Sequence, residues 1–233
     1  MILKNFSRRI LLSITGRTEE QWRTNLAEVE KRRLKKVALF LEFYNKEERQ
    51  KIYLAINKSR IKTIPLVHIK DDMDYEELVF LKKRFKTKCF NIHESHFNHL
   101  PRWKDFSKYI YLEMNYDNDI PKNVDMKKIG GFCIDLSHFM AAKARKAAEY
   151  QFVLSYKDRK DLFLCNHLNG YDPKEKKDVH TVKSFKDFDY LKELPEFVFG
   201  KYIAIETFNY IPEQIKFKKY LVKMLNKQFK VWF

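Results

Sequence analysis

The stretch "IGGFCIDLSHFMAAK", residues 129–143, places a short apolar run directly before a segment with helical periodicity. The run 129–135 has the length and composition of a buried β-strand, and a helix is expected over 138–155. Asp135 ends the strand and His138 follows about one helical turn later, so both side chains can face the same end of the sheet. This stretch therefore predicts a βα unit that presents a carboxylate and an imidazole at its carboxyl end.

Apolar runs of strand length recur at regular intervals on both sides of this unit. They are "ILLSIT" (10–15), "VALFLE" (37–42), "IPLVHI" (64–69), "CFNIH" (89–93), "YIYLE" (109–113), "LFLCNH" (162–167) and "YIAIE" (202–206). A capping box from Thr18 to Gln21 opens a helix through about Leu34, and Asp74 can cap the helix "YEELVFLKKRF". Further helices are expected at 46–58, 186–194 and 213–229, whereas 96–107 and 116–127 are expected to be mainly loop.

Eight strands alternating with helices predict a single (β/α)8 TIM-type barrel, with residues 1–233 forming one metal-binding domain. The strands are apolar on both faces, as in a parallel sheet covered by helices, and right-handed crossovers close such a sheet into a ring. A chain of 233 residues is close to the usual size of this architecture. The competing open, doubly wound sheet lacks support, because no glycine-rich nucleotide motif follows any strand.

The composition indicates a basic protein with a sizeable core. The net charge is +16, which favours partners such as DNA or a phosphorylated small molecule, although the lysines are spread over many helices as on an ordinary solvated surface. Cys89, Cys133 and Cys165 lie in expected strands without metal-finger spacing and are expected to be buried thiols. Without a signal peptide or a long apolar stretch, a soluble cytoplasmic protein with no membrane partner is expected. The oligomeric state is not indicated.

Seven of the eight expected strands end in a residue that can bind a metal or move protons. These residues are Glu42, His68, His93, Glu113, Asp135, His167 and Glu206. Strand ends of a parallel barrel converge on one open face, where enzymes of this architecture build their sites. Any one such residue is more often a solvated or capping group, but clustered carboxylates repel one another unless a cation lies among them. A divalent metal is therefore expected, with zinc favoured and manganese, magnesium or iron as alternatives.

The segment "NHLNGYDPKEKKDVH" (166–180) adds two further candidate ligands to these strand ends. Asp178 and His180 alternate, so their side chains share one face if the segment is extended. His96 and His99 lie in the loop after residue 93 and are expected to be surface groups. Glu42 is expected to pair with a lysine on the rim rather than to reach the site.

These motifs resemble those of the xylose isomerase-like TIM-barrel superfamily, most closely its endonuclease IV branch of abasic-site nucleases. The stretch "GGFCIDLSHFMAAK" is similar to a motif whose Asp and His are metal ligands, which implies that role for Asp135 and His138. "NHLNG" and "DVH" resemble the following motifs. The corresponding ligands are His167, Asp178, His180 and, from "AIETFN", Glu206.

Shorter similarities, "YLEMN", "FNIHESH" and "LVHI", imply ligand roles for Glu113, His93 and His68 and so fill nine positions of a three-metal site. The resemblance covers residues 64–210. This chain departs from the endonucleases in its shorter early loops, in the segment "TVKSFKDFD" after His180, and in Gly170, where the motif has an Asp. These departures put a DNA substrate in doubt.

Three functions follow as hypotheses. The first is a metal-dependent phosphodiesterase, in which metal-bound hydroxide attacks a phosphodiester bond in abasic DNA or a related phosphate ester. The second is a sugar or sugar-phosphate isomerase or epimerase with one divalent ion, in which Glu113 and Glu206 exchange a substrate proton and His138 binds a sugar oxygen. The third is a barrel that binds without catalysis. The surplus of candidate ligands favours the first, and the short loops favour the second.

Overall fold

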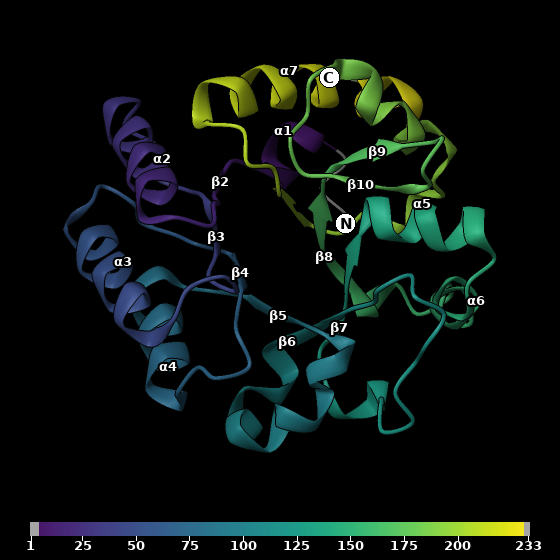
Figure 1. Ribbon diagram of the computed structural model, residues 1–233, viewed down its shortest axis with the longest axis horizontal. Coiled ribbons are helices and arrows are strands. Elements are labelled where there is room, and N and C mark those ends of the chain that lie inside the picture. Colours follow the sequence, from purple (N-terminus) through teal and green to yellow (C-terminus); the bar gives the residue numbers. More distant parts are fainter. Residues whose placement is uncertain (1–4, 231–233) are drawn as a thin grey trace.

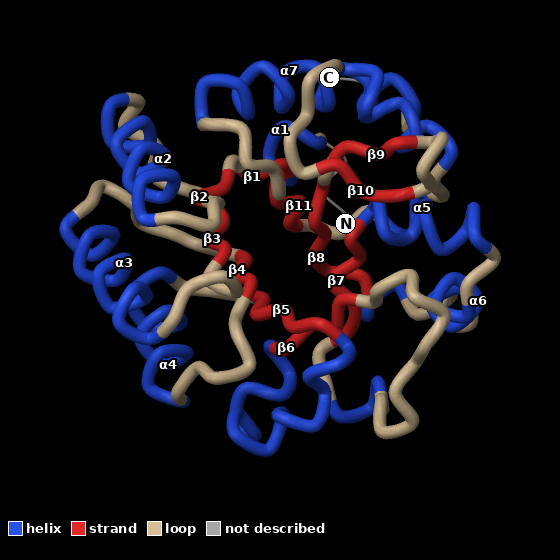
Figure 2. Tube along the Cα trace, viewed as in Figure 1, coloured by secondary structure: helices blue, strands red, loops and turns tan. Residues whose placement is uncertain are grey.

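The computed structural model describes residues 5–230 and shows a parallel sheet curled into a ring of strands with helices outside it (Figures 1 and 2). The order around the sheet is β1-β11-β8-β7-β6-β5-β4-β3-β2, and each pair in it is parallel. The strands are β1 (Ile10–Leu11), β2 (Ser13–Ile14), β3 (Ala38–Phe40), β4 (Leu66–His68), β5 (Cys89–His93), β6 (Ile110–Glu113), β7 (Gly131–Asp135), β8 (Phe163–Leu168) and β11 (Tyr202–Ile205).

The first expected strand, 10–15, closes the ring because its two halves pair with different strands. Its first part, β1, pairs with β11, and its second part, β2, pairs with β3. Leu12 lies between the two parts. Counting β1 and β2 as one broken strand gives eight strands, so the predicted parallel (β/α)8 barrel is confirmed.

Helices cover the outside of this ring. They are α1 (Phe6–Arg9), α2 (Glu19–Lys31), α3 (Lys46–Lys58), α4 (Tyr75–Phe85), α5 (Leu136–Arg145), α6 (Ala148–Leu154) and α7 (Ile211–Gln228). The predicted helix 46–58 is confirmed, and α2 begins with the predicted capping box, in which Thr18 accepts from the Gln21 backbone. At α4, Asp74 and Glu77 form a capping box as well. No helix among residues 5–230 has the length and apolar character needed to cross a membrane.

The single helix expected over 138–155 is wrong. Lys146 adopts a left-handed conformation with φ of 60°, and the Ala147 backbone N–H returns to the Ala142 carbonyl, which ends α5. A second helix, α6, then begins at Ala148. The segment "ARKAAEY" contains no glycine or proline, so the sequence pattern carries no signal for this break.

Several other connections are 3₁₀ helices. The segment η1 (Glu94–Tyr109) replaces the loop expected over 96–107, and η4 (Phe185–Glu193) replaces the α-helix expected over 186–194. Pro101 inside η1 has no backbone N–H to donate, which disfavours an uninterrupted α-helix there. Shorter 3₁₀ turns are η2 (Met126–Lys128), η3 (Lys160–Leu162) and η5 (Glu196–Val198). The polar segment after β8 forms an antiparallel hairpin of β9 (Gly170–Asp172) and β10 (Lys177–Val179).

Two apolar layers hold the barrel together. The larger layer fills the space between the ring and the helices. The smaller layer includes Phe40, Tyr111 and the three cysteines, which are buried and unpaired as expected. The Phe40 ring lies 4.9 Å from the His167 ring and 5.7 Å from the His68 ring, measured between centroids. Phe40 therefore forms part of an apolar floor beneath the polar side chains at the carboxyl ends of the strands.

Candidate metal centre

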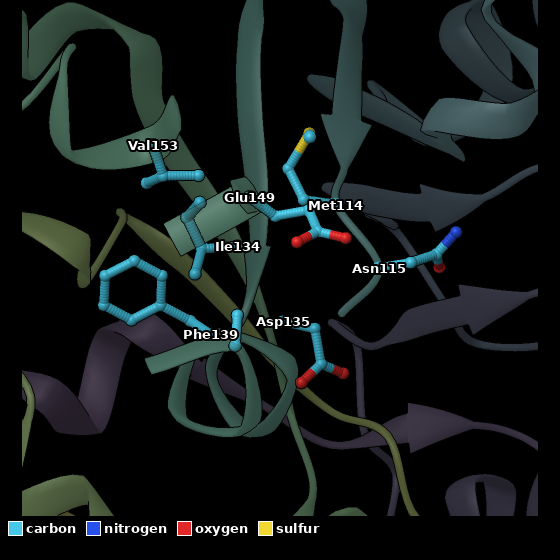
Figure 3. A pocket seen from close by; sticks show the side chains of 8 residues that line it. Met114, Asn115, Ile134, Asp135, Phe139, Glu149 and Val153 are labelled. Carbon is cyan, nitrogen blue, oxygen red and sulfur yellow. The ribbon is translucent and has the colours of Figure 1, made fainter. Parts of the chain in front are cut away.

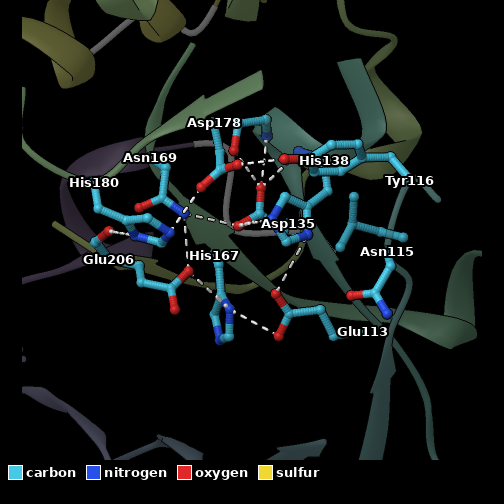
Figure 4. A network of polar contacts seen from close by, with 12 residues as sticks. Glu113, Asn115, Tyr116, Asp135, His138, His167, Asn169, Asp178, His180 and Glu206 are labelled. Carbon is cyan, nitrogen blue, oxygen red and sulfur yellow. Dashed lines mark hydrogen bonds and ion pairs between the residues drawn. The ribbon is translucent and has the colours of Figure 1, made fainter. Parts of the chain in front are cut away.

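Four of the predicted residues form a buried cluster at the carboxyl end of the ring, and Figure 4 shows how they face one another. Glu113 ends β6, Asp135 ends β7, His167 lies near the end of β8, and Glu206 follows β11. One potential ligand atom from each lies within 4.8 Å of those of the other three. Because these strands are neighbours in the sheet, the parallel topology alone brings the four side chains together.

His167 is the centre of this cluster. Its Nδ1 lies 3.0 Å from Glu113 Oε2 and 3.2 Å from Glu206 Oε2, yet it makes no hydrogen bond. On the other side of the ring, Nε2 lies 3.1 Å from Asn91 Oδ1. The Asn91 amide nitrogen donates to Glu113 Oε2 at 2.9 Å, so the Asn91 oxygen is free to accept from His167. Asn91 therefore keeps a proton on Nε2. Nδ1 faces the two carboxylates and carries a proton in the absence of a cation, and it offers its lone pair when a metal ion takes the place of that proton.

Asp135 is fixed by the helix that follows it. Its Oδ1 accepts hydrogen bonds from the backbones of Ser137 and His138, both at 2.8 Å, and so caps the start of α5. Its Oδ2 accepts from Asn169 Nδ2 at 2.8 Å, and the same amide group donates to Glu206 Oε2 at 2.9 Å. Asn169 therefore holds two buried carboxylates side by side.

A second cluster adjoins the first and consists of Glu42, His68 and His93. Glu42 Oε2 lies 3.0 Å from His68 Nε2 and 3.5 Å from His93 Nε2. His68 is 1% exposed, and neither of its ring nitrogens makes a hydrogen bond. The prediction that Glu42 pairs with a lysine on the rim is therefore wrong, because its carboxylate contacts two histidines of the site instead. His68 Nδ1 also lies 3.7 Å from Glu206 Oε1, which links the two clusters.

The electrostatics of the two clusters are dominated by opposite charges in a buried space. Burial lowers the pKa of His93, but Glu113, Glu42 and Glu206 outweigh it and raise the pKa to about 10. Burial raises the pKa of Glu113, but His167 and His93 outweigh it and lower the pKa to about 2. The pKa of Asp135 is raised by its burial. In the absence of a cation, the negative charge of these carboxylates is therefore compensated by protonated histidines.

His138, Asp178 and His180, the three remaining predicted ligands, do not form one cluster. His138 Nδ1 lies 3.8 Å from Glu113 Oε1, so His138 borders the first cluster. Asp178, on β10, lies 2.7 Å from His180 Nε2 and accepts a hydrogen bond from the Tyr116 hydroxyl at 2.6 Å. Burial raises the pKa of Asp178, but these two partners hold it well below its usual value. The structure thus presents a His–Asp–Tyr group beside the cluster.

Two further groups of potential ligands lie outside these clusters. Asp71 lies with His96 and His99 on the rim, where both histidines are partly exposed as the sequence suggested. Glu94 and Glu149, each 1% exposed, lie with Asp117 beneath the rim. Burial raises the pKa of Glu94 to about 8, so a bound proton accounts for this carboxyl at neutral pH.

A cavity of about 10 Å³ lies behind Asp135, and Figure 3 shows the side chains around it. Its lining includes Met114, Ile134, Phe139 and Glu149. A space of this size accommodates about one water molecule and no sugar or nucleotide. At the mouth of the barrel, the His138 and His180 side chains are 13% and 27% exposed, so they border the clusters from the solvent side.

The chain matches no protein-family model and no curated protein. Among solved structures, it is similar to the crystal structure of a D-tagatose 3-epimerase-like protein, with a TM-score of 0.53 and 14% sequence identity. The match covers 94% of this chain and 99% of that chain. This likeness shows the fold alone, a parallel α/β barrel of the TIM type. None of the comparisons supports the endonuclease IV branch of the resemblance seen in the sequence.

The residues of the first cluster fit a divalent metal ion. Imidazole and carboxylate are the ligands of zinc and related ions, and bonds of about 2.1 Å separate neighbouring ligand atoms by about 3.0–3.4 Å. The two distances from His167 Nδ1, 3.0 and 3.2 Å, lie in this range. The nitrogen is buried without a hydrogen bond, which is costly unless another partner binds its lone pair.

Sequence reasoning missed the asparagines that orient these ligands. Asn91 precedes His93 by two residues in β5, and Asn169 follows His167 by two residues. Alternate residues of a strand point to the same face of the sheet. The position of Asn91 two residues before His93 could therefore have predicted that both side chains face the interior of the barrel. Asn169 lies between β8 and β9, which belong to different sheets, and its contact with Glu206 depends on the tertiary structure.

Proposed function

We propose that this protein is a divalent-metal-dependent isomerase or epimerase acting on a sugar or a sugar phosphate. The observation that carries the proposal is the buried cluster of Glu113, Asp135, His167 and Glu206 at the mouth of the barrel. The similarity in fold to a D-tagatose 3-epimerase-like protein over nearly the whole chain supports the same class. The net charge of +16 favours an anionic substrate such as a sugar phosphate.

The two glutamates are the proposed proton-transfer groups. They approach the same nitrogen of His167 from different strands, so they border a common space from two sides. The pKa values of both are held low by the surrounding histidines despite burial, so both are ionised and able to accept a proton. One carboxylate removes the proton from the carbon next to the substrate carbonyl. That group gives the isomer when it returns the proton to the adjacent carbon, and the epimer forms when the other glutamate, having taken a proton from solvent, delivers it to the opposite face of the first carbon.

The neighbouring residues have supporting roles in this proposal. Asp135 and His167 would hold the metal together with the glutamates, and a bound divalent ion would supply polarisation of the substrate carbonyl. His138 lies at the mouth, 3.8 Å from Glu113, and is placed to bind a sugar oxygen. Asn91 and Asn169 orient His167, Asp135 and Glu206 through the hydrogen bonds described above.

The test is exchange of substrate hydrogen with solvent. Purified protein loaded with zinc, manganese, cobalt or magnesium is incubated in D₂O with a panel of ketoses, aldoses and their phosphates, and the products are followed by NMR. We expect deuterium at the carbon next to the carbonyl, accompanied by a new epimer or isomer, for at least one substrate. Glu206→Gln should reduce the rate at least about 10³-fold, because amide cannot accept the proton.

Glu175→Gln is the matched control, because Glu175 is exposed in the turn of the β9–β10 hairpin. This variant should keep the rate of the wild type. Absence of exchange for every substrate and every metal would reject the proposal, provided that the protein is folded.

A second candidate function, phosphodiester hydrolysis, is favoured by the adjoining cluster of Glu42, His68 and His93. Two neighbouring metal ions can stabilise the attacking and leaving oxygens of a phosphate. His138, Asp178 and His180 are not among the groups whose potential ligand atoms all lie within 4.8 Å of one another, so we propose no third ion. Incision of a duplex containing an abasic site by the metal-loaded protein, lost in His68→Gln and in Glu206→Gln, is the result that would favour this function over isomerisation.

A further inference from the structure

Three side chains on the outer rim of the barrel meet apart from the two clusters at its mouth. Asp71 lies in the loop between β4 and α4, whereas His96 and His99 lie in η1. Asp71 Oδ2 is 3.4 Å from His96 Nδ1 and 3.8 Å from His99 Nδ1. One ligand atom from each of the three lies within 4.8 Å of the others.

The local structure explains why the two imidazoles face the same carboxylate. A 3₁₀ helix has three residues per turn, so side chains at positions i and i+3 lie directly above one another. His96 and His99 have this spacing near the start of η1, and their ring centroids are 5.8 Å apart. The same sequence in an α-helix would set the two side chains about 60° apart around the axis.

Other contacts hold the two segments in this position. The Arg102 guanidinium donates to the Asp71 carbonyl at 2.7 Å, and the indole N–H of the buried Trp103 donates to the Met73 carbonyl at 2.9 Å. These two hydrogen bonds fix the loop against η1. His99 Nδ1 also lies 3.4 Å from the Asp71 carbonyl oxygen, a long contact that a bound ion would replace. The arrangement is therefore set before a ligand binds, which reduces the ordering that binding would require.

We propose that Asp71, His96 and His99 form a separate rim site for a divalent transition-metal ion of the zinc, cobalt or nickel type. Two imidazoles and a carboxylate are the ligand set that these ions prefer over calcium or magnesium. Zinc bonds of about 2.1 Å in a tetrahedron place ligand atoms about 3.4 Å apart, close to the separations on the rim. The three side chains are 29–41% exposed, so an ion can enter from solvent and keep water at its remaining position.

The contacts on the rim are longer than a direct charge-assisted hydrogen bond of about 2.7–2.9 Å, because Asp71 Oδ2 lies 3.4 Å from His96 and 3.8 Å from His99. An ion bound between the three ligand atoms accounts for both distances. Binding of an ion would join the loop after β4 to η1 and so stiffen one side of the barrel mouth.

The test is the stoichiometry of bound zinc in the full-length protein, measured by equilibrium dialysis at pH 7.5 followed by elemental analysis. His96→Gln and His99→Gln should each bind one zinc ion fewer per chain than the wild type. Asn98→Gln is the matched control, because Asn98 is exposed in η1 between the two histidines. It should bind as many ions as the wild type does.

Two further measurements separate this site from the clusters at the mouth and from misfolding. In EDTA, the histidine variants should melt at the wild-type temperature, whereas zinc should raise their melting temperature less than it raises that of the wild type. Glu206→Gln should retain the ion that His99→Gln loses, whatever reaction the mouth of the barrel catalyses. Equal zinc stoichiometry in His99→Gln, Asn98→Gln and the wild type would overturn the proposal.

Discussion

Asn91 shows how a single uncharged residue controls the chemistry available to its neighbours. It has no exposed surface, and it uses both ends of its amide, donating to Glu113 and accepting from His167. Because the Asn91 nitrogen donates to Glu113, the Asn91 oxygen is the atom that faces His167. Because that oxygen can only accept a hydrogen bond, the His167 nitrogen next to it, Nε2, carries a proton. The position of a lone pair at the centre of the cluster thus depends on a residue that touches no solvent.

We expect Asn91→Ala to weaken divalent-metal binding by about 10–100-fold, the usual effect of removing an orienting partner from a ligand histidine. The cause is that His167 can rotate or change its proton position once the Asn91 oxygen is gone. Calorimetric titration with zinc or manganese measures the change.

Asn166→Ala is the control for this prediction. Asn166 is also fully buried, but its amide serves the backbone groups of Ile134, Val198 and Gly200. Its removal should lower stability and leave the metal affinity of the folded protein within about threefold of the wild type, since no ligand loses its partner. Equal losses of affinity in the two variants would contradict the orienting role of Asn91.

At the scale of elements, α3 and α4 are joined by a buried ion pair rather than by apolar contacts alone. Arg49 of α3 donates two hydrogen bonds to Glu77 of α4, at 2.9 and 3.0 Å, and both side chains are buried. The Tyr53 hydroxyl donates to the same carboxylate at 2.7 Å. Glu77 also accepts from the Asp74 backbone, so one carboxylate caps α4 and anchors it to α3.

Glu77→Gln should lower the free energy of unfolding by about 2–3 kcal/mol at pH 7, because Arg49 would stay buried with only the half-exposed Asp72 as counter-charge. Burial raises the pKa of Glu77, but hydrogen bonds from Arg49 and Tyr53 outweigh it, and the pKa lies below its ordinary value of 4.5. The contribution of Glu77 is therefore complete above pH 4.5 and is lost as the pH falls through the lower folded-state value.

Urea unfolding at pH 7 and at successively lower pH checks this prediction, since the difference between the variant and the wild type should shrink below pH 4.5. Glu47→Gln, on the exposed side of α3, should change the free energy of unfolding by less than about 0.5 kcal/mol at any pH. A difference that is independent of pH would show that the charge of Glu77 is not what stabilises the two helices.

The elements of this barrel differ in how well the sequence predicts them. Strands with apolar side chains on both faces and helices with capping residues, such as α3 and α4, follow from local pattern. The strand ends also follow, and with them the convergence of His68, Glu113 and Glu206 on one face. The break at Lys146 does not follow, because a left-handed lysine has no sequence signature. Nor does the contact of Glu42 with two histidines, which depends on how the loop after β3 turns toward the mouth.

The closure of the whole barrel depends on contacts between the beginning and the end of the chain. Phe6 donates its backbone N–H to Asn226, and Ile211 donates its backbone N–H to Asn25. Gln214 of α7 accepts from the Ser13 backbone N–H at 2.8 Å and donates to the Ser13 carbonyl at 3.1 Å. Beyond Leu11 the first strand no longer pairs with β11. At Ser13 the Gln214 side chain thus makes the two backbone hydrogen bonds that a neighbouring strand would otherwise make.

Gln214→Leu should lower the free energy of unfolding by about 2–4 kcal/mol, because it removes the side-chain partner of three buried backbone groups, the Ser13 N–H and the carbonyls of Ser13 and Asn209, at a nearly unchanged side-chain volume. Denaturant midpoints of the variant and the wild type measure this cost. Gln151→Leu, at an exposed position in α6, serves as the control and should change stability by less than about 0.5 kcal/mol. If both substitutions have the same small effect, Gln214 does not stabilise the closure.

The position of β11 also constrains how the protein forms on the ribosome. Within residues 5–230, the one strand that pairs with β1 is β11, and most of the chain separates the two in sequence. Until β11 has been synthesised, the strand edge formed by Ile10 and Leu11 therefore has no strand to pair with. An unpaired apolar edge of this kind can associate with another chain. We expect chaperones that bind extended apolar segments to associate with nascent chains until Tyr202–Ile205 has emerged, and to be released as the ring closes.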